Sequence, residues 1–301
     1  MAEGDHISWC IVPTVIAVAV LIIAVFLEFF ARKNPAIRKL AETLKSGAFL
    51  SPTIISITIG FLLIISSWHN FLFAPGLGLD ESLTAQIIRY SQAVIGIGLV
   101  LGLFIRYLTL GIIVLFIAGF FIFPALSMLD YLIYPGIGVF LFLIHRDVLS
   151  SAFIFHPIEK KEFLDKYRKF ALPILRFLAG LGLAYAAFHH NIFDTSGALK
   201  FLQEKPTLNF MQNVFGFSNF TNTYFIFTTG VFGMLAGIIL MFGLLERFSA
   251  SIIGIGLLIM AIIMGWSFLP LAIPYFAVIY SVITGNQFEE REIFDKSVKP
   301  S

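Results

Sequence analysis

The sequence predicts an all-α, polytopic integral membrane protein, and three observations lead to this fold class. Hydrophobic residues make up 58% of the 301 residues and charged residues only 13%, whereas about 25% of the residues in a soluble domain are charged. The mean hydropathy is +0.93. Long apolar runs alternate with short charged stretches, which is typical of a chain that crosses a bilayer repeatedly as helix. This composition excludes a soluble enzyme and a disordered scaffold, and the net charge of +2 gives no reason to expect a nucleic-acid partner.

Nine segments are apolar enough to cross roughly 30 Å of hydrocarbon as helices. We expect them at about 7–31, 53–73, 87–105, 107–124, 130–145, 173–191, 223–244, 248–267 and 269–285. The first contains no lysine or arginine before its apolar stretch, so we expect a retained anchor rather than a signal peptide. Spans 87–105 and 107–124 follow each other so closely that they must form a tight hairpin. An eight-span arrangement with one broken or re-entrant span is the alternative.

The basic residues predict the orientation of these spans. With the N-terminus outside and the C-terminus in the cytoplasm, only Arg89, Lys200 and Lys205 of the 20 basic residues fall on the outer side. An excess of lysine and arginine marks cytoplasmic segments. Each missed span would invert the sides of everything after it, so the charge distribution favours nine spans. We expect an integral protein of a prokaryotic cytoplasmic membrane.

An internal duplication organises the chain. Residues 60–69 (GFLLIISSWH) resemble residues 180–189 (GLGLAYAAFH), and residues 96–107 resemble residues 237–248. Five residues of the second match recur: Gly96, Ile97, Gly102, Leu103 and Arg106 return as Gly237, Ile238, Gly243, Leu244 and Arg247. Each unit holds four spans and therefore has the same orientation as the other, which gives a parallel repeat rather than the inverted repeat common in secondary transporters.

The duplication divides the chain into five parts. They are an N-terminal helix with a basic linker (1–50), a first four-helix unit (51–146), a cytoplasmic linker (147–172), a second four-helix unit (173–285) and a cytoplasmic tail (286–301). Glycines at GxxxG spacing, such as Gly98 with Gly102 and Gly233 with Gly237, predict close helix packing inside each unit. The repeat gives Gly102 and Gly243 the same packing role.

The two units resemble the DoxX/DoxD family of small four-helix membrane proteins. The resemblance rests on the Gly-rich first helix that ends in an aromatic and a polar residue and on the GLxxR pattern, best seen in 102–111 and 242–256. It implies association with membrane oxidoreductases, including thiosulfate:quinone oxidoreductase and thiol-redox complexes. The chain departs from the family in carrying two units. Its single cysteine, Cys10, lies outside both units, so thiol exchange within the chain is not expected.

His69 and His189 are the leading candidates for chemistry, because each follows the first helix of its unit at the outer boundary. An imidazole there could accept a proton from a quinol, hydrogen-bond a quinone carbonyl, or ligate a metal or haem iron. His190 adds a second imidazole next to His189. The alternative is an interfacial anchor beside Trp68 and Phe188, as is common at the headgroup boundary.

Arg106 and Arg247 recur at the inner ends of the third helices. They are expected to anchor the helices at the interface or to contact lipid phosphates or a partner's carboxylates. The acids Glu28, Asp130 and Glu246 lie at span ends rather than at span centres, which argues against a proton pump or an ion channel. The sequence shows no phosphate-binding loop, HExxH motif or paired catalytic carboxylates, so no catalytic residue and no dedicated metal site is predicted.

These observations predict a membrane-embedded subunit of an oxidoreductase or respiratory-type complex, which anchors a partner and shapes a quinone site but is not catalytic alone. Its expected partners are membrane lipids and the other membrane or soluble subunits of that complex. The sequence does not identify a cofactor; quinone is the first candidate and haem the second. The alternatives are a non-catalytic accessory or scaffold subunit and a carrier of lipid or a small solute.

Overall fold

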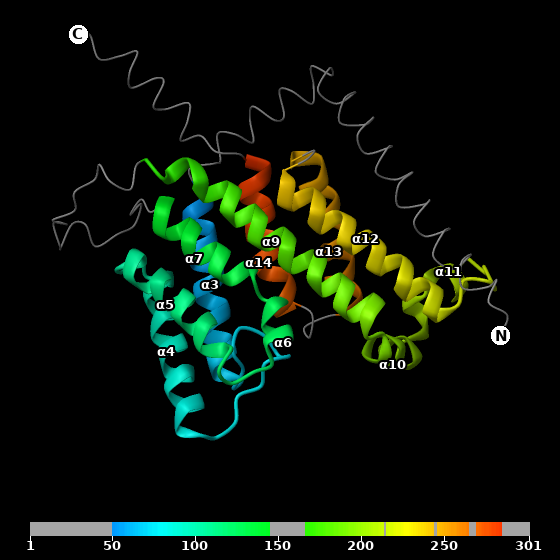
Figure 1. Ribbon diagram of the computed structural model, residues 1–301, viewed down its shortest axis with the longest axis horizontal. Coiled ribbons are helices and arrows are strands. Elements are labelled where there is room, and N and C mark those ends of the chain that lie inside the picture. Colours follow the sequence, from blue (N-terminus) through cyan, green and yellow to red (C-terminus); the bar gives the residue numbers. More distant parts are fainter. Residues whose placement is uncertain (1–49, 145–165, 214, 244–245, 265–268, 285–301) are drawn as a thin grey trace, which may run out of the picture.

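The structure is a computed structural model that describes residues 50–144, 166–213, 215–243, 246–264 and 269–284 (Figure 1). These residues are helical; the part of the chain described holds no strand, and its single extended pairing is an isolated bridge between Phe71 and Gly78. The eight longer helices are α3 (Ser51–Trp68), α4 (Leu83–Val100), α5 (Ile105–Gly119), α7 (Ile133–Ile144), α9 (Ala171–Phe188), α12 (Asn222–Phe242), α13 (Glu246–Met264) and α14 (Leu269–Thr284).

The predicted spans from 53 onward each coincide with one of these helices, with ends displaced by a few residues. Four helical segments are long and apolar enough to cross a membrane: Ser51–Trp68, Leu83–Val100, Arg168–Phe193 and Asn222–Phe242. Four shorter apolar helices accompany them. The chain therefore has the character of an integral membrane protein. The span at 7–31 and Cys10 lie outside the described residues.

Each of the eight helices packs against the next one along the chain, and the last, α14, packs against the first, α3. We call this closed order of contacts the ring. Figure 1 shows α3, α7, α9 and α14 in the centre, with α4 and α5 on one side and α12 on the other. At the point of closure, the hydroxyl oxygens of Ser51 and Thr284 lie 3.0 Å apart in a buried hydrogen bond. We call α3, α4, α5 and α7 the N-terminal group, and α9, α12, α13 and α14 the C-terminal group.

Glycines allow the first two helices of each group to touch backbone to backbone. A Cβ atom added to Gly60 on α3 would lie 2.7 Å from the carbonyl oxygen of Gly96 on α4. A Cβ atom added to Gly180 on α9 would lie 2.5 Å from the carbonyl oxygen of Gly237 on α12. These four positions are the ones that the repeat matches. The two groups thus contain the same close crossing, and no residue larger than glycine fits it without a shift.

Gly102 and Gly243 end helices, a role that the sequence did not predict for them. They follow the last turns of α4 and α12 with φ values of +69° and +66°, so both are left-handed residues. Both are also closely packed, since Gly102 is buried and a Cβ atom at Gly243 would lie 2.5 Å from the guanidinium of Arg176. After α4, the amide of Leu103 donates to the carbonyl of Gly98 over 2.8 Å, which is the Schellman pattern of a helix end. The left-handed backbone explains why both positions are glycine.

The loop after α3 folds back onto the N-terminal group and closes its end. Phe73 is fully buried, and its ring stacks on Tyr134 of α7 at a centroid distance of 4.2 Å. The fully buried amide of Gln92 accepts a hydrogen bond from the Phe73 amide and donates to the carbonyls of Leu63 and Phe71. These bonds satisfy a loop backbone that would otherwise be buried without partners.

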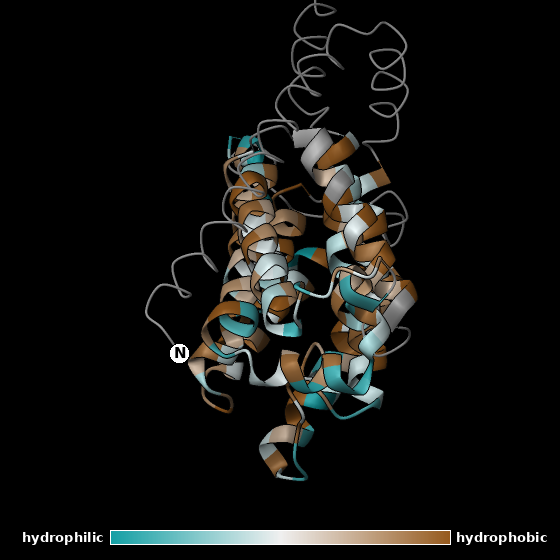
Figure 2. Cartoon of the chain, turned by 90° about the vertical axis from the view of Figure 1, so that its right-hand side faces the viewer, coloured by the Kyte–Doolittle hydropathy of each residue, from teal (hydrophilic) through white to brown (hydrophobic). Residues whose placement is uncertain are grey.

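Large apolar side chains cover the outside of the helices. Val94 on α4, Val114 on α5 and Ile262 on α13 are 64%, 63% and 74% exposed. Figure 2 shows the same distribution, with hydrophobic residues along the helix lengths. In water such a surface would be an association site, whereas in a bilayer it faces lipid tails and needs no partner.

Candidate functional site

The site begins where α9 widens into a π-helical turn, His189–Phe193. The amide of Asp194 donates to the carbonyl of His189 over 2.8 Å, so the hydrogen bond spans five residues instead of four. Such widened turns occur often at functional sites, because they change the directions of neighbouring side chains. Here the turn carries His189 and His190, both named by the sequence analysis.

Small residues on α12 make room for the widened turn. A Cβ atom added to Gly230 would lie 2.8 Å from the Cβ atom of Asn191 and 2.9 Å from a side-chain carbon of Ile192. A Cβ atom added to Gly233 would lie 2.6 Å from that of Ala187. The π turn therefore fits against α12 because these two positions have no side chain.

Asp130 reaches the same place from the N-terminal group. It follows the short helix α6 (Ala125–Leu129) and precedes α7. This corner of the chain rests on α9 at Gly182, where an added Cβ atom would lie 3.6 Å from the carbonyl oxygen of Asp130.

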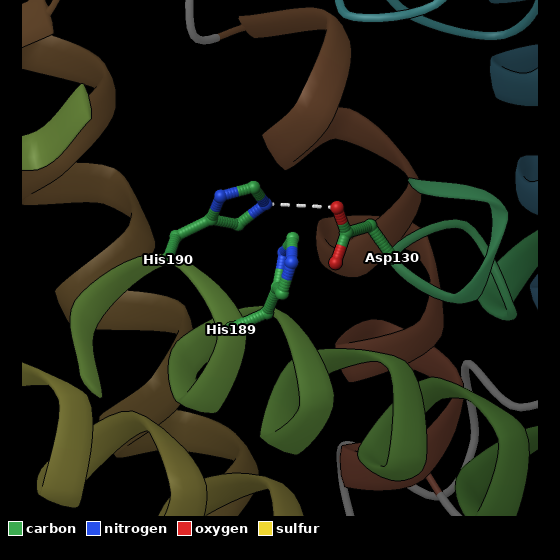
Figure 3. Close-up of side chains that lie close together, drawn as sticks. All are labelled: Asp130, His189 and His190. Atoms are coloured by element: carbon green, nitrogen blue, oxygen red, sulfur yellow. Dashed lines mark hydrogen bonds and ion pairs between the residues drawn. The ribbon is translucent and has the colours of Figure 1, made fainter. Parts of the chain in front are cut away.

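The three side chains converge (Figure 3). Nε2 of His190 lies 2.8 Å from Oδ2 of Asp130 in a hydrogen-bonded pair. The His190 side chain is 57% exposed and that of Asp130 only 12%. One potential ligand atom from each of Asp130, His189 and His190 lies within 4.8 Å of the other two.

Two polar atoms of this cluster have no hydrogen-bond partner among the described residues. They are Nδ1 of His189 and Oδ1 of Asp130, and both are buried. The imidazole of His189 is fixed by stacking on Tyr185 at 5.5 Å and on Phe193 at 6.2 Å. A buried polar atom without a partner costs about 1–3 kcal/mol. These two atoms therefore favour an additional ligand at this position.

Asp194 adds negative charge beside the cluster. Hydrogen bonds from the hydroxyl and the amide of Ser196 lower its pKa, and the charges of His189 and His190 lower it further. Asp194 is exposed and therefore stays a carboxylate in neutral solution. Its charge favours a cation or a proton donor near the two histidines.

His69 occupies the place in the N-terminal group that matches His189, since each residue follows the last residue of its helix. Its surroundings differ. The His69 imidazole is exposed and stacks on Phe71 at 6.0 Å, and it does not belong to the Asp130 cluster. The residue after it is Asn70, whose side-chain oxygen Oδ1 accepts a hydrogen bond from the guanidinium of Arg89 over 2.7 Å. The two histidines that the repeat relates therefore lie in different chemical environments.

Arg106 and Arg247, the two arginines predicted to contact lipid or a partner, lie at the starts of corresponding helices. Arg106 is the second residue of α5 and is half-buried, and Arg247 is the second residue of α13. The side chain of Arg247 lies outside the described residues. Contacts of these arginines with lipid or a partner stay predictions.

Sequence reasoning missed the role of Asp130. It noted this acid only as one that lies at a span end. The predicted topology does place Asp130 and His189 at the same outer boundary, which is the signal that could have suggested a pairing. The sequence does not say that the corner before α7 lies against α9, and this contact alone brings the residues together.

No family model matches the sequence, and neither a curated protein nor a solved structure is significantly similar to the chain.

Proposed function

We propose that this chain is a membrane-embedded subunit of an oxidoreductase assembly and that it presents a quinone head group to the cluster of Asp130, His189 and His190. The observation that carries the proposal is the buried, unpartnered Nδ1 atom of His189 beside the hydrogen-bonded pair of His190 and Asp130. The resemblance to the DoxX/DoxD family points in the same direction.

The chemistry of a quinol suits this arrangement. Oxidation of a quinol releases two protons and two electrons. Nδ1 of His189 would accept one quinol proton, and the pair of His190 and Asp130 would accept the other. Both protons would leave at the exposed side of His190. The electrons would go to a redox group of a partner subunit, since this chain is proposed only to bind the quinol and to position it.

We also propose the architecture that this function requires. It comprises nine spans, an outer N-terminus and a cytoplasmic C-terminus in a prokaryotic cytoplasmic membrane, and a duplicated four-helix unit. The matched crossings of Gly60 with Gly96 and of Gly180 with Gly237 support the duplication. The shared left-handed conformation of Gly102 and Gly243 supports it as well.

Purification of the full chain from its native membrane in mild detergent tests the proposal. We expect co-purification with a subunit that carries flavin, haem or an iron–sulfur cluster, visible by absorbance, and retained quinone visible by mass spectrometry. His189→Ala and His190→Ala should each lower quinone-dependent turnover without lowering subunit recovery after gel filtration. His69→Ala is the matched control and should leave turnover unchanged.

The outcomes separate the proposal from its main alternative. Normal turnover and recovery in the His189→Ala/His190→Ala double variant would leave a non-catalytic accessory or scaffold subunit. A chain that purifies without any redox partner would overturn the assignment to an oxidoreductase assembly.

A further inference from the structure

We propose that Asp130, His189 and His190 form a binding site for a divalent first-row transition metal ion such as Zn²⁺ or Cu²⁺. The proposal is independent of the proposed function. All three ligands belong to this chain, so the purified chain would bind the ion without any partner subunit. It assigns to the cluster a ligand that the sequence pattern did not predict.

The donor set suits such an ion. Two imidazoles and one carboxylate form a ligand set that transition metals favour, and Ca²⁺ or Mg²⁺ would instead require mostly oxygen ligands. A catalytic-type zinc site has three protein ligands and one open position for water or another molecule. The exposed side of His190 leaves that position accessible from outside.

The distances are those of a site before the ion enters. Ligand atoms around a tetrahedral zinc ion stand about 3.3–3.6 Å apart, given bonds of about 2.0–2.2 Å. Nε2 of His190 and Oδ2 of Asp130, 2.8 Å apart in a hydrogen bond, would separate slightly and release their shared proton to solvent when the ion enters. The ligand atoms all lie within 4.8 Å of one another, so the required side-chain movements are small.

The two orphaned atoms give independent support. Buried polar atoms are nearly always paired, so the unpartnered Nδ1 of His189 and Oδ1 of Asp130 favour a ligand at this place. A metal ion coordinated by His189 and Asp130 would compensate for their burial. Asp194, whose pKa is lowered by Ser196, adds a negative charge close to the ion.

The backbone around the cluster limits how far the ligands can move apart. His189 and His190 are adjacent, and in a regular α-helix their side chains would diverge by about 100°. The π turn changes this direction, and Gly230 and Gly233 hold the turn against α12. Asp130 is held by the contact of its corner with Gly182. The site is thus built on helices of both groups, and an ion there would link them.

Titration of the full chain with Zn²⁺ tests the proposal. The chain is purified in detergent with a tag free of histidine, stripped with a chelator, and titrated by isothermal calorimetry at a fixed pH. Alanine replaces His6, His145 and His156 in every sample, because a histidine elsewhere in the chain could also bind Zn²⁺. We expect one equivalent of Zn²⁺ to bind. His189→Ala, His190→Ala and Asp130→Ala should each weaken that binding at least tenfold, and His69→Ala should leave it unchanged.

Co²⁺ provides a second readout that a folding defect does not imitate. The visible absorption of bound Co²⁺ reports low coordination number, and it should be present in the parent chain and in His69→Ala but lost in His190→Ala. Gel filtration and circular dichroism identify folded variants. Absence of stoichiometric binding in the parent chain, or equal binding in all folded variants, would overturn the metal site.

The metal site and the proposed quinone contact can be tested independently of each other. A metal ion and a quinol would compete for His189, so added Zn²⁺ should inhibit quinone-dependent turnover of the assembly if both hold. Stoichiometric binding without any effect on turnover would retain the metal site and reject the quinone contact at these residues.

Discussion

Nε2 of His190 lies 2.8 Å from Oδ2 of Asp130, across the seam where α9 meets the corner before α7. The pair joins the N-terminal and C-terminal groups on the side where both groups end their first helix. His69, in the matching place on α3, lies outside the cluster. Among the described residues, the similar sequence stretches 60–69 and 180–189 therefore accompany one such cluster and not two.

This pair should contribute measurably but modestly to stability. Because His190 is more than half exposed, solvent screens the interaction, and a double-mutant cycle of Asp130→Ala and His190→Ala should give a coupling energy of about 0.2–1 kcal/mol. Reversible unfolding in mixed micelles provides the measurement. The cycle of Asp130→Ala with His69→Ala is the control and should be additive; coupling of similar size there would show that the effect is not specific to the pair.

The helix crossing at Gly237 should not tolerate a side chain. In Gly237→Ala the new methyl group would lie 2.5 Å from the carbonyl oxygen of Gly180, and the helices would have to separate. We expect a loss of about 1–3 kcal/mol, seen as a lower unfolding temperature. Gly256→Ala is the control, since nothing lies within 4 Å of its added Cβ atom. Equal stability of the two variants would contradict the close crossing.

At Gly102 and Gly243, the stability of a variant should depend more on how readily the new residue adopts the left-handed conformation than on the size of its side chain. Alanine in the left-handed conformation costs roughly 1–2 kcal/mol, and asparagine should restore part of the loss because it adopts this conformation more readily. Gly243→Ala and Gly102→Ala should cost similar amounts, because the Arg176 guanidinium that would lie 2.5 Å from the new Cβ atom of residue 243 is the end of a flexible side chain and can move. Thermal unfolding in detergent measures both. If asparagine destabilises as much as alanine, packing rather than backbone conformation is the cause.

Gln92 should be essential to the loop that closes the N-terminal group. Gln92→Leu would remove the partners of the Phe73 amide and the Phe71 carbonyl, and each buried orphan costs about 1–3 kcal/mol. Hydrogen exchange in the loop should rise together with the loss of stability. Gln86→Leu, on the exposed side of the same helix, is the comparison. A Gln92 variant as stable as the Gln86 variant would show that these bonds do not hold the loop.

The topology prediction can be tested by labelling intact cells. Single cysteines at positions 40, 160 and 292, in a chain without Cys10, should resist an impermeant thiol reagent applied from outside. Lys200→Cys on the exposed side of α10 (Ser196–Glu204) should react. Labelling at 160 with protection at 40 would defeat the duplicated-unit arrangement, since both linkers must lie on one side.

The sequence predicted most of the helices and about half of the site. Hydropathy marks the segments that leave water, so the predicted spans 53–73 and 223–244 match α3 and α12 closely. Hydropathy does not encode which helix lies beside which, so the contact that brings Asp130 to His190 was not predictable. The π turn was also missed, because the glycines that accommodate it lie on a different helix.

The hydrogen bond between Ser51 and Thr284 has a consequence for how a shortened chain could be rearranged. It brings the first turn of α3 and the last turn of α14 side by side, so a short connection could join them in a chain trimmed to residues 50–284. The chain could then be opened between residues 144 and 166 to give a circular permutant that starts with α9 and ends with α7. Such a permutant would keep every helix contact of the ring, including the corner that carries Asp130, while exchanging which half is synthesised first.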